Sequence, residues 1–581
     1  MSVRFNTRKL TILAQDPAVR INGNLVFAQV EIPYEDLGDG PTGYRVKVVD
    51  FDGSANVLYR PFKVGGEVDG MPVDGFAVPD GLSAPQRRAW EKRLLADPTF
   101  HSQNVYAIVM RILTCFELAL GRRVEWGFQG HQLHVAPHAF LEANAYYSED
   151  DKALLFGYFD SRRAKGRVFT CLSHDIVAHE TTHAVLDGIR DGFTSPSTPD
   201  QAAFHEGFAD VVALLSVFSL RETVELALTD GGKVDLLPGG LRKVLKERVS
   251  REAILASFLL GIGKEFGSSL DEEGARADCL RRSVRIEPSA HLLDSPGYEE
   301  AHARGELFAA AVLRTFVAMW SRRIDGLGTF DGKHCNLDMV VEEGARAAGH
   351  LLTMVIRALD YCPPVDLTFG AYLSALLTAD TEVAPDDTQY MYRSLLRETF
   401  ASFGILPAPQ GTDPESGCWQ PFDHTSDIVY HRNHSDSMLH DKEEVFRFLW
   451  ENRRTLRIDD RGYLRVCSVR PSVRQGPDGF FVRETICEYR QVAQMFGAET
   501  MSQLGIERPE GMSTRQAYTA YGGGTLVFDE YGRIKYHIEH RLDDGARQSA
   551  RLEYLWRNGL HDQLSDSTSN FSELHRNRIT S

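Results

Sequence analysis

The chain has 581 residues, enough for about two to four domains of ordinary size. Its hydrophobic content of 43% and charged content of 25% are ordinary for a soluble globular protein. A net charge of −17 argues against nucleic acid as a partner, and no run of about 18 apolar residues predicts a helix that spans a membrane.

The beginning of the chain and its cysteines indicate a compartment. The first residues lack the apolar stretch of a signal peptide. The eight cysteines are scattered without a Cys-x-x-Cys pair, as expected of reduced thiols. We therefore expect a cytoplasmic protein with no membrane partner, although export without a signal would leave no trace. The cysteines are interpreted as core residues or unreactive surface thiols rather than ligands, and the histidines outside the motifs below as surface residues.

Patterns of apolar residues divide the first 406 residues. Residues 1–94 predict a β-rich region, because segments such as 26–32 and 44–49 alternate between apolar and polar side chains. Residues 104–120 are apolar on nearly all sides and stop at Gly121, which predicts a buried helix. Strand-like patterns return over 131–170, and helical patterns dominate 171–406.

The most informative motif is His-Glu-Thr-Thr-His at residues 179–183. Histidines four residues apart lie on one face of a helix, roughly 5–6 Å apart at Cβ. That spacing lets both imidazoles of His179 and His183 bind one zinc ion. Glu180 then lies where a general base would act on water. Ser173 is expected to cap this helix, with Asp175 in its first turn and Gly188 at its end.

A second helix is predicted directly after this motif. Thr198-Pro199-Asp200-Gln201 reads as a capping box with proline at the first helical position. Glu206 on this helix offers a third protein ligand, which leaves the fourth position of a catalytic zinc site open. Asp210, one turn further on, is expected to accept a hydrogen bond from His179. The alternative interpretation is an amphipathic helix pair with solvated histidine and glutamate side chains.

The remainder of the chain is predicted as a separate part. Residues 408–424 have the composition of a linker, and residues 425–563 predict an α+β module, a candidate for binding a protein partner. Within it, 464–469 with 480–483, and 525–528 with 533–538, have the pattern of hairpins. The three glycines at 522–524 are interpreted as a flexible turn, since no helix start follows to form a phosphate site. Residues 564–581 are polar and predicted to be disordered.

Residues 95–407 resemble the thermolysin-like branch of the gluzincin zinc metallopeptidases. The resemblance rests first on the His-Glu-x-x-His motif followed by a glutamate and, four residues on, an aspartate. Asn144-Ala145-Tyr146-Tyr147 is similar to the edge strand on which the family holds its substrate. Residues 300–306, before an apolar helix, are similar to the family's Val-His-x-x-x-Gly element, although Gly305 comes one residue early. Residues 279–283 are similar to its Leu-Arg-Ser stretch.

This resemblance implies a fold and a set of roles. The fold is an α+β multidomain protein with a strand-rich N-terminal lobe, a helical C-terminal lobe and the active-site helix between them. The implied cofactor is Zn²⁺, held by His179, His183 and Glu206, with Glu180 as the general base. His302 would stabilise the charged transition state. The residues implied to bind the peptide substrate are Asn144, Ala145 and Arg281.

The sequence also departs from the family. Residues 193–197 contain no tyrosine where the family has its oxyanion tyrosine, so His302 is expected to carry that function, or Tyr298 to replace it. Val217 stands where the family's calcium site needs an acid, so we expect no such site. The predicted function is a zinc-dependent endopeptidase acting on a peptide or protein substrate. The alternatives are a catalytically silent zinc-binding scaffold and a zinc hydrolase of a non-peptide substrate.

Overall fold

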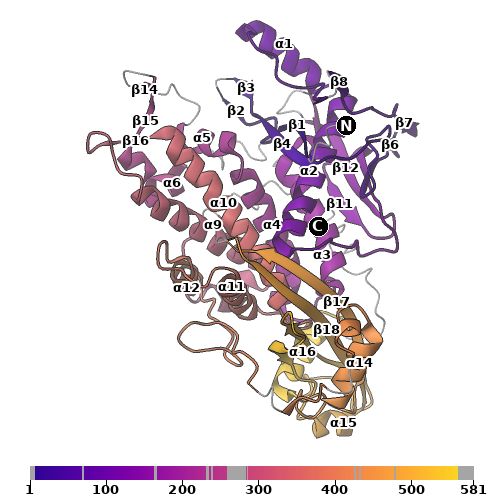
Figure 1. The fold of residues 1–581 in the computed structure, drawn as a ribbon. Coiled ribbons are helices and arrows are strands. Elements are labelled where there is room, and N and C mark those ends of the chain that lie inside the picture. Colours follow the sequence, from indigo (N-terminus) through magenta and orange to yellow (C-terminus); the bar gives the residue numbers. More distant parts are fainter. Residues whose placement is uncertain are drawn as a thin grey trace.

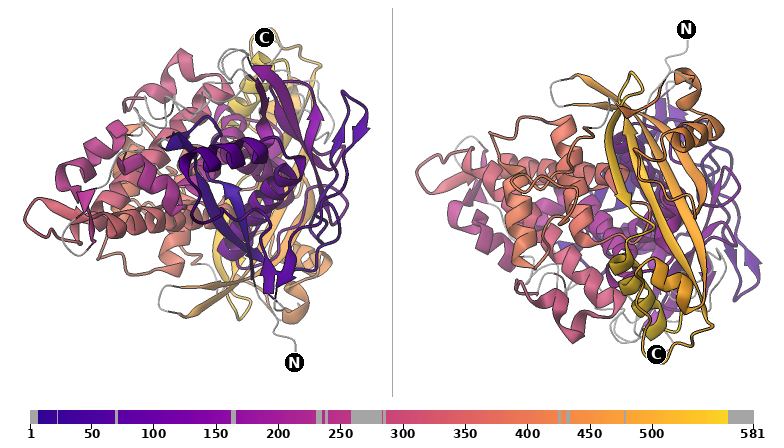
Figure 2. Two further views of the ribbon diagram at one scale, coloured as in Figure 1. Left: turned by 90° about the horizontal axis from the view of Figure 1, so that it is seen from above. Right: turned by 90° about the horizontal axis from the view of Figure 1, so that it is seen from below.

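A computed structural model describes residues 7–21, 23–68, 71–161, 166–229, 235–236, 240–257, 283, 286–423, 427–430, 434–476 and 479–560. Arg281 and the predicted tail at 564–581 lie outside the described residues. The protein is an α+β multidomain protein with strand-rich, helical and C-terminal sheet regions (Figure 1). In both views of Figure 2 the helices between residues 221 and 402 lie to the left, and the N-terminal strands and C-terminal sheet lie to the right.

The N-terminal region begins with an antiparallel ribbon of β1 (Thr7–Leu13) and β4 (Phe27–Pro33). Buried and exposed side chains alternate along most of β4, the pattern of a half-buried strand. Short strands and one helix complete the region: β2 (Arg20–Ile21), β3 (Asn24–Leu25), β6 (Phe51–Asp52), β7 (Val57–Leu58), β8 (Gly66–Val68), β9 (Met71–Val73) and α1 (Ala84–Leu94).

The main N-terminal sheet has five strands in the order β11-β12-β10-β5, with β13 also paired to β12. Its strands are β5 (Val46–Val48), β10 (Leu133–Phe140), β11 (Ala145–Ser148), β12 (Ala153–Ser161) and β13 (Gly166–Phe169). β5 pairs with β10 in parallel, so one sheet contains strands from both sides of the boundary predicted at residue 94. β11 stands at the other edge, paired only with β12 within the described residues.

The helix predicted over 104–120 is confirmed as α2 (Pro98–Leu120), buried on nearly all sides. The Asp97 carboxylate caps it by accepting the Thr99 N–H at 3.0 Å, and Gly121 ends it with φ +67°. By length and composition α2 is long and apolar enough to cross a membrane, but 72% of its most apolar window is buried in the protein, as in a core helix.

Eight further helices and three short strands follow α2 in the described part of residues 171–406. The helices are α3 (His174–Ile189), α4 (Pro199–Phe218), α5 (Arg221–Thr229), α6 (Arg251–Ser257), α9 (Ala301–Asp325), α10 (Leu337–Ala358), α11 (Phe369–Val383) and α12 (Tyr392–Ser402). The strands β14 (Asp235–Leu236), β15 (Arg242–Leu245) and β16 (His334–Asn336) form a small sheet. One hydrophobic core connects these helices to β1 and β4 and to the inner face of the C-terminal sheet.

The C-terminal region is a four-stranded antiparallel sheet in chain order, which confirms both predicted hairpins. Its strands are β17 (Tyr463–Gln475), β18 (Phe481–Phe496), β19 (Ala517–Phe528) and β20 (Ile534–His540). The accompanying helices are α13 (Ser435–Met438), α14 (Lys442–Glu451), α15 (Ala498–Gln503) and α16 (Gly545–Arg557).

The prediction of a flexible turn at 522–524 is wrong, because these glycines lie inside β19. A Cβ atom on Gly523 would meet the Tyr489 carbonyl oxygen at 2.4 Å, and one on Gly524 would meet the Tyr489 hydroxyl oxygen at 2.8 Å. The glycines therefore make room for the neighbouring strand and its buried tyrosine.

Buried ion pairs join the C-terminal sheet to the helices. Arg474 of β17 binds Asp360, and it reaches Glu484 at 2.7 Å. Arg122 donates two hydrogen bonds, of 2.6 and 2.7 Å, to the carboxylate of the same Asp360. Burial alone would raise the pKa of Asp360, but the two arginines hold it well below its usual value. Removing one partner would leave a buried charge unpaired, so this network fixes the sheet against the helices.

The stretch predicted as a linker, 408–424, packs against the helices over the residues that the structure describes. The Ala408 N–H donates to the Ser374 hydroxyl at 3.0 Å, and the Trp419 indole N–H donates to the Tyr361 carbonyl at 2.9 Å. Its prolines and glycines exclude regular structure but do not prevent packing.

Candidate metal centre

Helix α3, which carries the His-Glu-x-x-His motif, begins after Ser173. The hydroxyl oxygen of Ser173 lies 2.6 Å from a carboxylate oxygen of Asp175 and 3.0 Å from one of Asp16, and it does not cap a helical N–H. Gly188 does not end the helix as predicted, since α3 continues to Ile189. A Cβ at Gly188 would lie 1.8 Å from the Glu125 carbonyl oxygen, so this glycine serves a close backbone approach instead.

Helix α4 begins where predicted, with Pro199 in its first turn and the Thr198 hydroxyl accepting the Gln201 N–H at 3.1 Å. The side chain of Gln201 does not return to the cap. It donates to the Gly192 and Ser195 carbonyls at 3.0 and 2.6 Å, and so holds the connection between the two helices close to α4.

The three predicted ligands meet in the folded chain. Nε2 of His179 lies 2.9 Å from Nε2 of His183 and 3.4 Å from a carboxylate oxygen of Glu206. Nε2 of His183 lies 3.8 Å from the other Glu206 oxygen. All three side chains are buried, and their ligand atoms lie within 4.8 Å of one another. This grouping excludes the alternative of solvated histidine and glutamate side chains.

The donor set fits a zinc ion. Nδ1 of His179 lies 2.8 Å from Asp210, as predicted. A carboxylate only accepts hydrogen bonds, so Nδ1 carries the proton and Nε2 turns its lone pair toward His183 and Glu206. Two imidazole nitrogens and one carboxylate oxygen are typical zinc ligands. Two Zn–N bonds at a tetrahedral angle separate the nitrogens by about 3.4 Å, so the rings need to open by only a few tenths of an ångström.

Glu180 lies at the edge of the N-terminal sheet. It is completely buried, and its carboxylate accepts the Tyr147 N–H of β11 at 3.0 Å. This bond joins α3 to the edge strand and holds the carboxylate beside the first ligand of the motif. The Tyr147 hydroxyl donates to Asp187 at 2.8 Å, a second bond between the same strand and helix.

His302 reaches the cluster from the first turn of α9. Its Nε2 lies 3.9 Å from Glu206, and its Nδ1 lies 2.5 Å from Glu300, the residue that caps α9. Burial would raise the pKa of Glu300, but hydrogen bonds from His302 and the Ala303 N–H lower it to about 2. The negative charge of Glu300 therefore orients the imidazole, with Nε2 directed at the cluster.

Two glycines allow α9 to cross α4 closely enough to bring His302 near Glu206. A Cβ on Gly207 of α4 would lie 2.8 Å from the Gly305 carbonyl oxygen, and one on Gly305 of α9 would lie 2.9 Å from the Ala203 carbonyl oxygen. Helices can cross this closely only where both lack a side chain. Since Gly207 follows Glu206 and Gly305 lies one turn after His302, the crossing brings the two side chains together.

The other predicted residues lie as follows. Asn144 precedes β11 and its side-chain oxygen accepts the Ala145 N–H at 2.8 Å. Tyr298 lies in the short helix η6 (Pro296–Tyr298), where burial and the nearby Glu306 raise its pKa. Val217 is buried, and its side chain offers no oxygen ligand. Arg281 lies outside the described residues.

The expectation that the remaining histidines are surface residues is wrong for several of them. His205 is buried and stacks on His183, with ring centroids 4.7 Å apart and Nδ1 atoms 2.8 Å apart. It therefore supports the second ligand of the motif. In the sequence, the position of His205 directly before Glu206 was the feature that could have indicated this role. The histidines at 101, 138 and 174 are buried as well, and those at 101 and 138 have contacts at both ring nitrogens.

Comparison of the chain with protein-family models and with curated proteins finds no match. The family resemblance therefore remains an expectation from the motif residues of the sequence.

Proposed function

We propose that this protein is a zinc-dependent endopeptidase with a thermolysin-like core over residues 95–407. The observation that carries the proposal is the convergence of His179, His183 and Glu206 beside Glu180, next to the edge strand β11. The burial of Glu180 next to the first ligand supports an enzyme, since a purely structural zinc site does not need a carboxylate there.

His179, His183 and Glu206 would hold the zinc ion. When bound, zinc supplies Lewis-acid chemistry: it polarises a carbonyl group and makes water a better nucleophile near neutral pH. Glu180 takes the proton from the attacking water and gives it to the leaving amine. The Tyr147 N–H, 3.0 Å from its carboxylate, keeps Glu180 in position for both transfers.

His302 would serve the developing negative charge on the substrate oxygen. Its Nδ1 is held by the Glu300 carboxylate, so Nε2, which is directed toward Glu206, would donate to the substrate oxygen in the imidazolium form, whose charge Glu300 balances. A donor fixed in advance in a partly dehydrated site stabilises the transition state more than one that must reorient. The absence of a tyrosine from residues 193–197 makes this histidine the main side-chain donor in the proposal.

The edge strand β11 supports a peptide as the substrate. An edge strand can pair with an extended peptide through its outward backbone groups. The Ala145 and Tyr147 backbones point to the same side, and the Tyr147 N–H already meets Glu180 there. A substrate paired along Ala145, with the Asn144 side chain beside it, would carry its scissile bond to Glu180. Arg281 would add a further contact.

A digest of a peptide library tests the proposal against its alternatives. Wild-type protein should cleave internal peptide bonds, and a zinc chelator or Glu180→Gln should stop the cleavage. A silent scaffold would bind zinc and leave every peptide intact. A hydrolase of another substrate class would also spare the peptides but would turn over ester or amide model compounds in a manner that depends on Glu180.

A further inference from the structure

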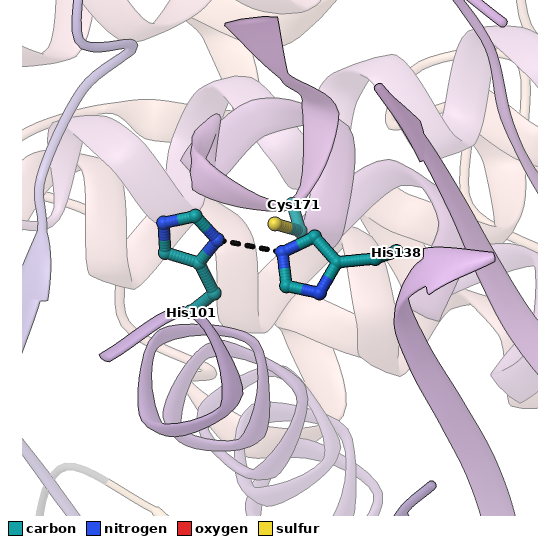
Figure 3. A group of neighbouring side chains, drawn as sticks. All are labelled: His101, His138 and Cys171. Carbon is teal, nitrogen blue, oxygen red and sulfur yellow. Dashed lines mark hydrogen bonds between the residues drawn. The ribbon is translucent and has the colours of Figure 1, made fainter. Parts of the chain in front are cut away.

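A second cluster of potential ligands lies away from the candidate metal centre (Figure 3). Nδ1 of His101 on α2 lies 2.7 Å from Nε2 of His138 on β10. The Cys171 sulfur lies within 4.8 Å of both nitrogens, on the short helix η1 (Thr170–Leu172). Relative exposure is 0% for His101 and Cys171 and 2% for His138. No motif spacing in the sequence connects these residues.

The hydrogen bonds around the cluster fix the protons of both rings. Nε2 of His101 lies 3.0 Å from the Leu95 carbonyl oxygen, which only accepts, so Nε2 carries a hydrogen. Nδ1 of His138 lies 2.9 and 3.0 Å from the two oxygens of Asp50, so it also donates. The two nitrogens that face each other at 2.7 Å therefore both present lone pairs in the neutral rings.

Two lone pairs this close repel unless a positive charge lies between them. A proton shared by the two rings would supply this charge as a buried imidazolium beside Asp50, but it would leave the Cys171 thiol unused. Phe169 packs edge-on against both rings, at 4.7 and 5.2 Å between centroids, and adds no polar group. A metal cation satisfies both lone pairs and also accounts for the thiol beside them.

We propose that His101, His138 and Cys171 bind a second metal ion, a structural cation of the kind that accepts imidazole and thiolate ligands. Zn²⁺ and Cu⁺ share this ligand chemistry. Asp50 would orient His138 from outside, as carboxylates do for ligating histidines. Burial raises the pKa of the Cys171 thiol well above its usual value; on binding, the sulfur would ligate the cation as thiolate and its proton would be released to solvent.

The location of the cluster indicates what the ion would do. It joins α2, β10 and the short helix that leads into α3, and through Asp50 it also reaches the N-terminal region. Cys171 stands two residues before Ser173, at the start of the helix that carries the motif. The ion would therefore brace the candidate active site without touching substrate, and the inference is independent of the proposed peptidase activity.

Cobalt provides a test, because of the two described clusters only this one contains sulfur. Full-length protein is produced in zinc-depleted medium with Co²⁺, and its absorption is measured for sulfur-to-cobalt charge transfer in the near ultraviolet. We expect this band in the wild type and in His183→Ala. It should be lost in Cys171→Ser and kept in Cys115→Ser, a control on the same helix as His101. Metal analysis should give two ions per chain in the wild type and one in His183→Ala and in Cys171→Ser.

A wild-type protein without the band, holding one ion or none, would overturn the proposal and leave His101 and His138 as a pair that shares a proton. X-ray absorption of the His183→Ala protein gives the same decision if Cys171→Ser does not fold, since a sulfur neighbour of the metal is either present or absent. Analysis of protein from ordinary medium then distinguishes zinc from copper. A failed peptidase assay would not affect these measurements.

Discussion

His179 and His183 come from one helix and meet a carboxylate, whereas His101 and His138 come from separate elements and meet a thiol. In both clusters two imidazole nitrogens face each other, at 2.9 and 2.7 Å, and in both an aspartate holds an outer nitrogen. The surroundings differ. His302 and Asp210 beside the first cluster each have side chains 17% exposed, whereas His101 and Cys171 have no exposed surface. A similar donor arrangement thus has partly exposed neighbours in one place and is fully buried in the other.

The two clusters also differ in the carboxylate that lies beside each of them. Glu180 lies beside the first cluster, where its carboxylate accepts the backbone N–H of Tyr147 at 3.0 Å. Asp50 beside the second cluster has both oxygens engaged by His138. Catalytic and structural metal sites differ in this way, by an available base and an open coordination position rather than by the histidines.

The largest effect is expected from Glu180→Gln. The glutamine keeps the size of the side chain and loses its basicity, so peptide cleavage should fall by about 10²–10⁴-fold. Both metal ions should remain, because neither cluster uses this carboxylate as a ligand. Steady-state kinetics with parallel metal analysis checks the prediction. Cleavage within about tenfold of the wild type would mean that another group is the base.

His302→Ala should reduce kcat by about 10²–10³-fold, the usual effect of removing one donor to a developing oxyanion. kcat and kcat/KM should fall together, because the interaction forms only in the transition state. Tyr298→Phe is the matched comparison and should have little effect. If instead Tyr298→Phe is slow and His302→Ala is normal, the tyrosine is the donor.

Substitution of Asp210 or of Asp50, the aspartates beside the outer imidazole nitrogens, should affect the two clusters differently. Asp210→Asn should weaken metal binding at the candidate active site by about 10–100-fold, so that activity becomes sensitive to low concentrations of chelator. Asp50→Asn should weaken the second site by a similar factor and lower the melting temperature, with little change in kcat of the loaded protein. Competition with a chelator, followed by activity and by thermal melting, measures both. Identical behaviour of the two variants would contradict the division into catalytic and structural sites.

The smallest effect is expected from calcium. Val217 replaces the acid that the family's calcium site requires, and Ca²⁺ needs about six to eight oxygen ligands. The melting temperature should therefore be the same with millimolar calcium and with a calcium-selective chelator. A rise of many degrees on adding calcium would reveal an oxygen-rich site elsewhere in the chain.

Local sequence was sufficient to predict which residues form the first cluster. Helical periodicity places His179 and His183 on one face, and the start of α4 after Thr198 brings Glu206 and Asp210 onto one face of a second helix. Turn residues likewise predicted both C-terminal hairpins. Each of these features depends on residues a few positions apart, whose relative geometry the backbone fixes.

Only the tertiary structure decided which distant surfaces meet. His101, His138 and Cys171 lie on three elements, so no period relates them. The same holds for Asp360 between Arg122 and Arg474, which attaches the C-terminal sheet to the helices. Gly188 and Gly523 are glycines because another backbone approaches them, although the sequence alone suggested a helix end and a turn. Periodicity defines the faces of an element, and packing of the whole chain determines what those faces contact.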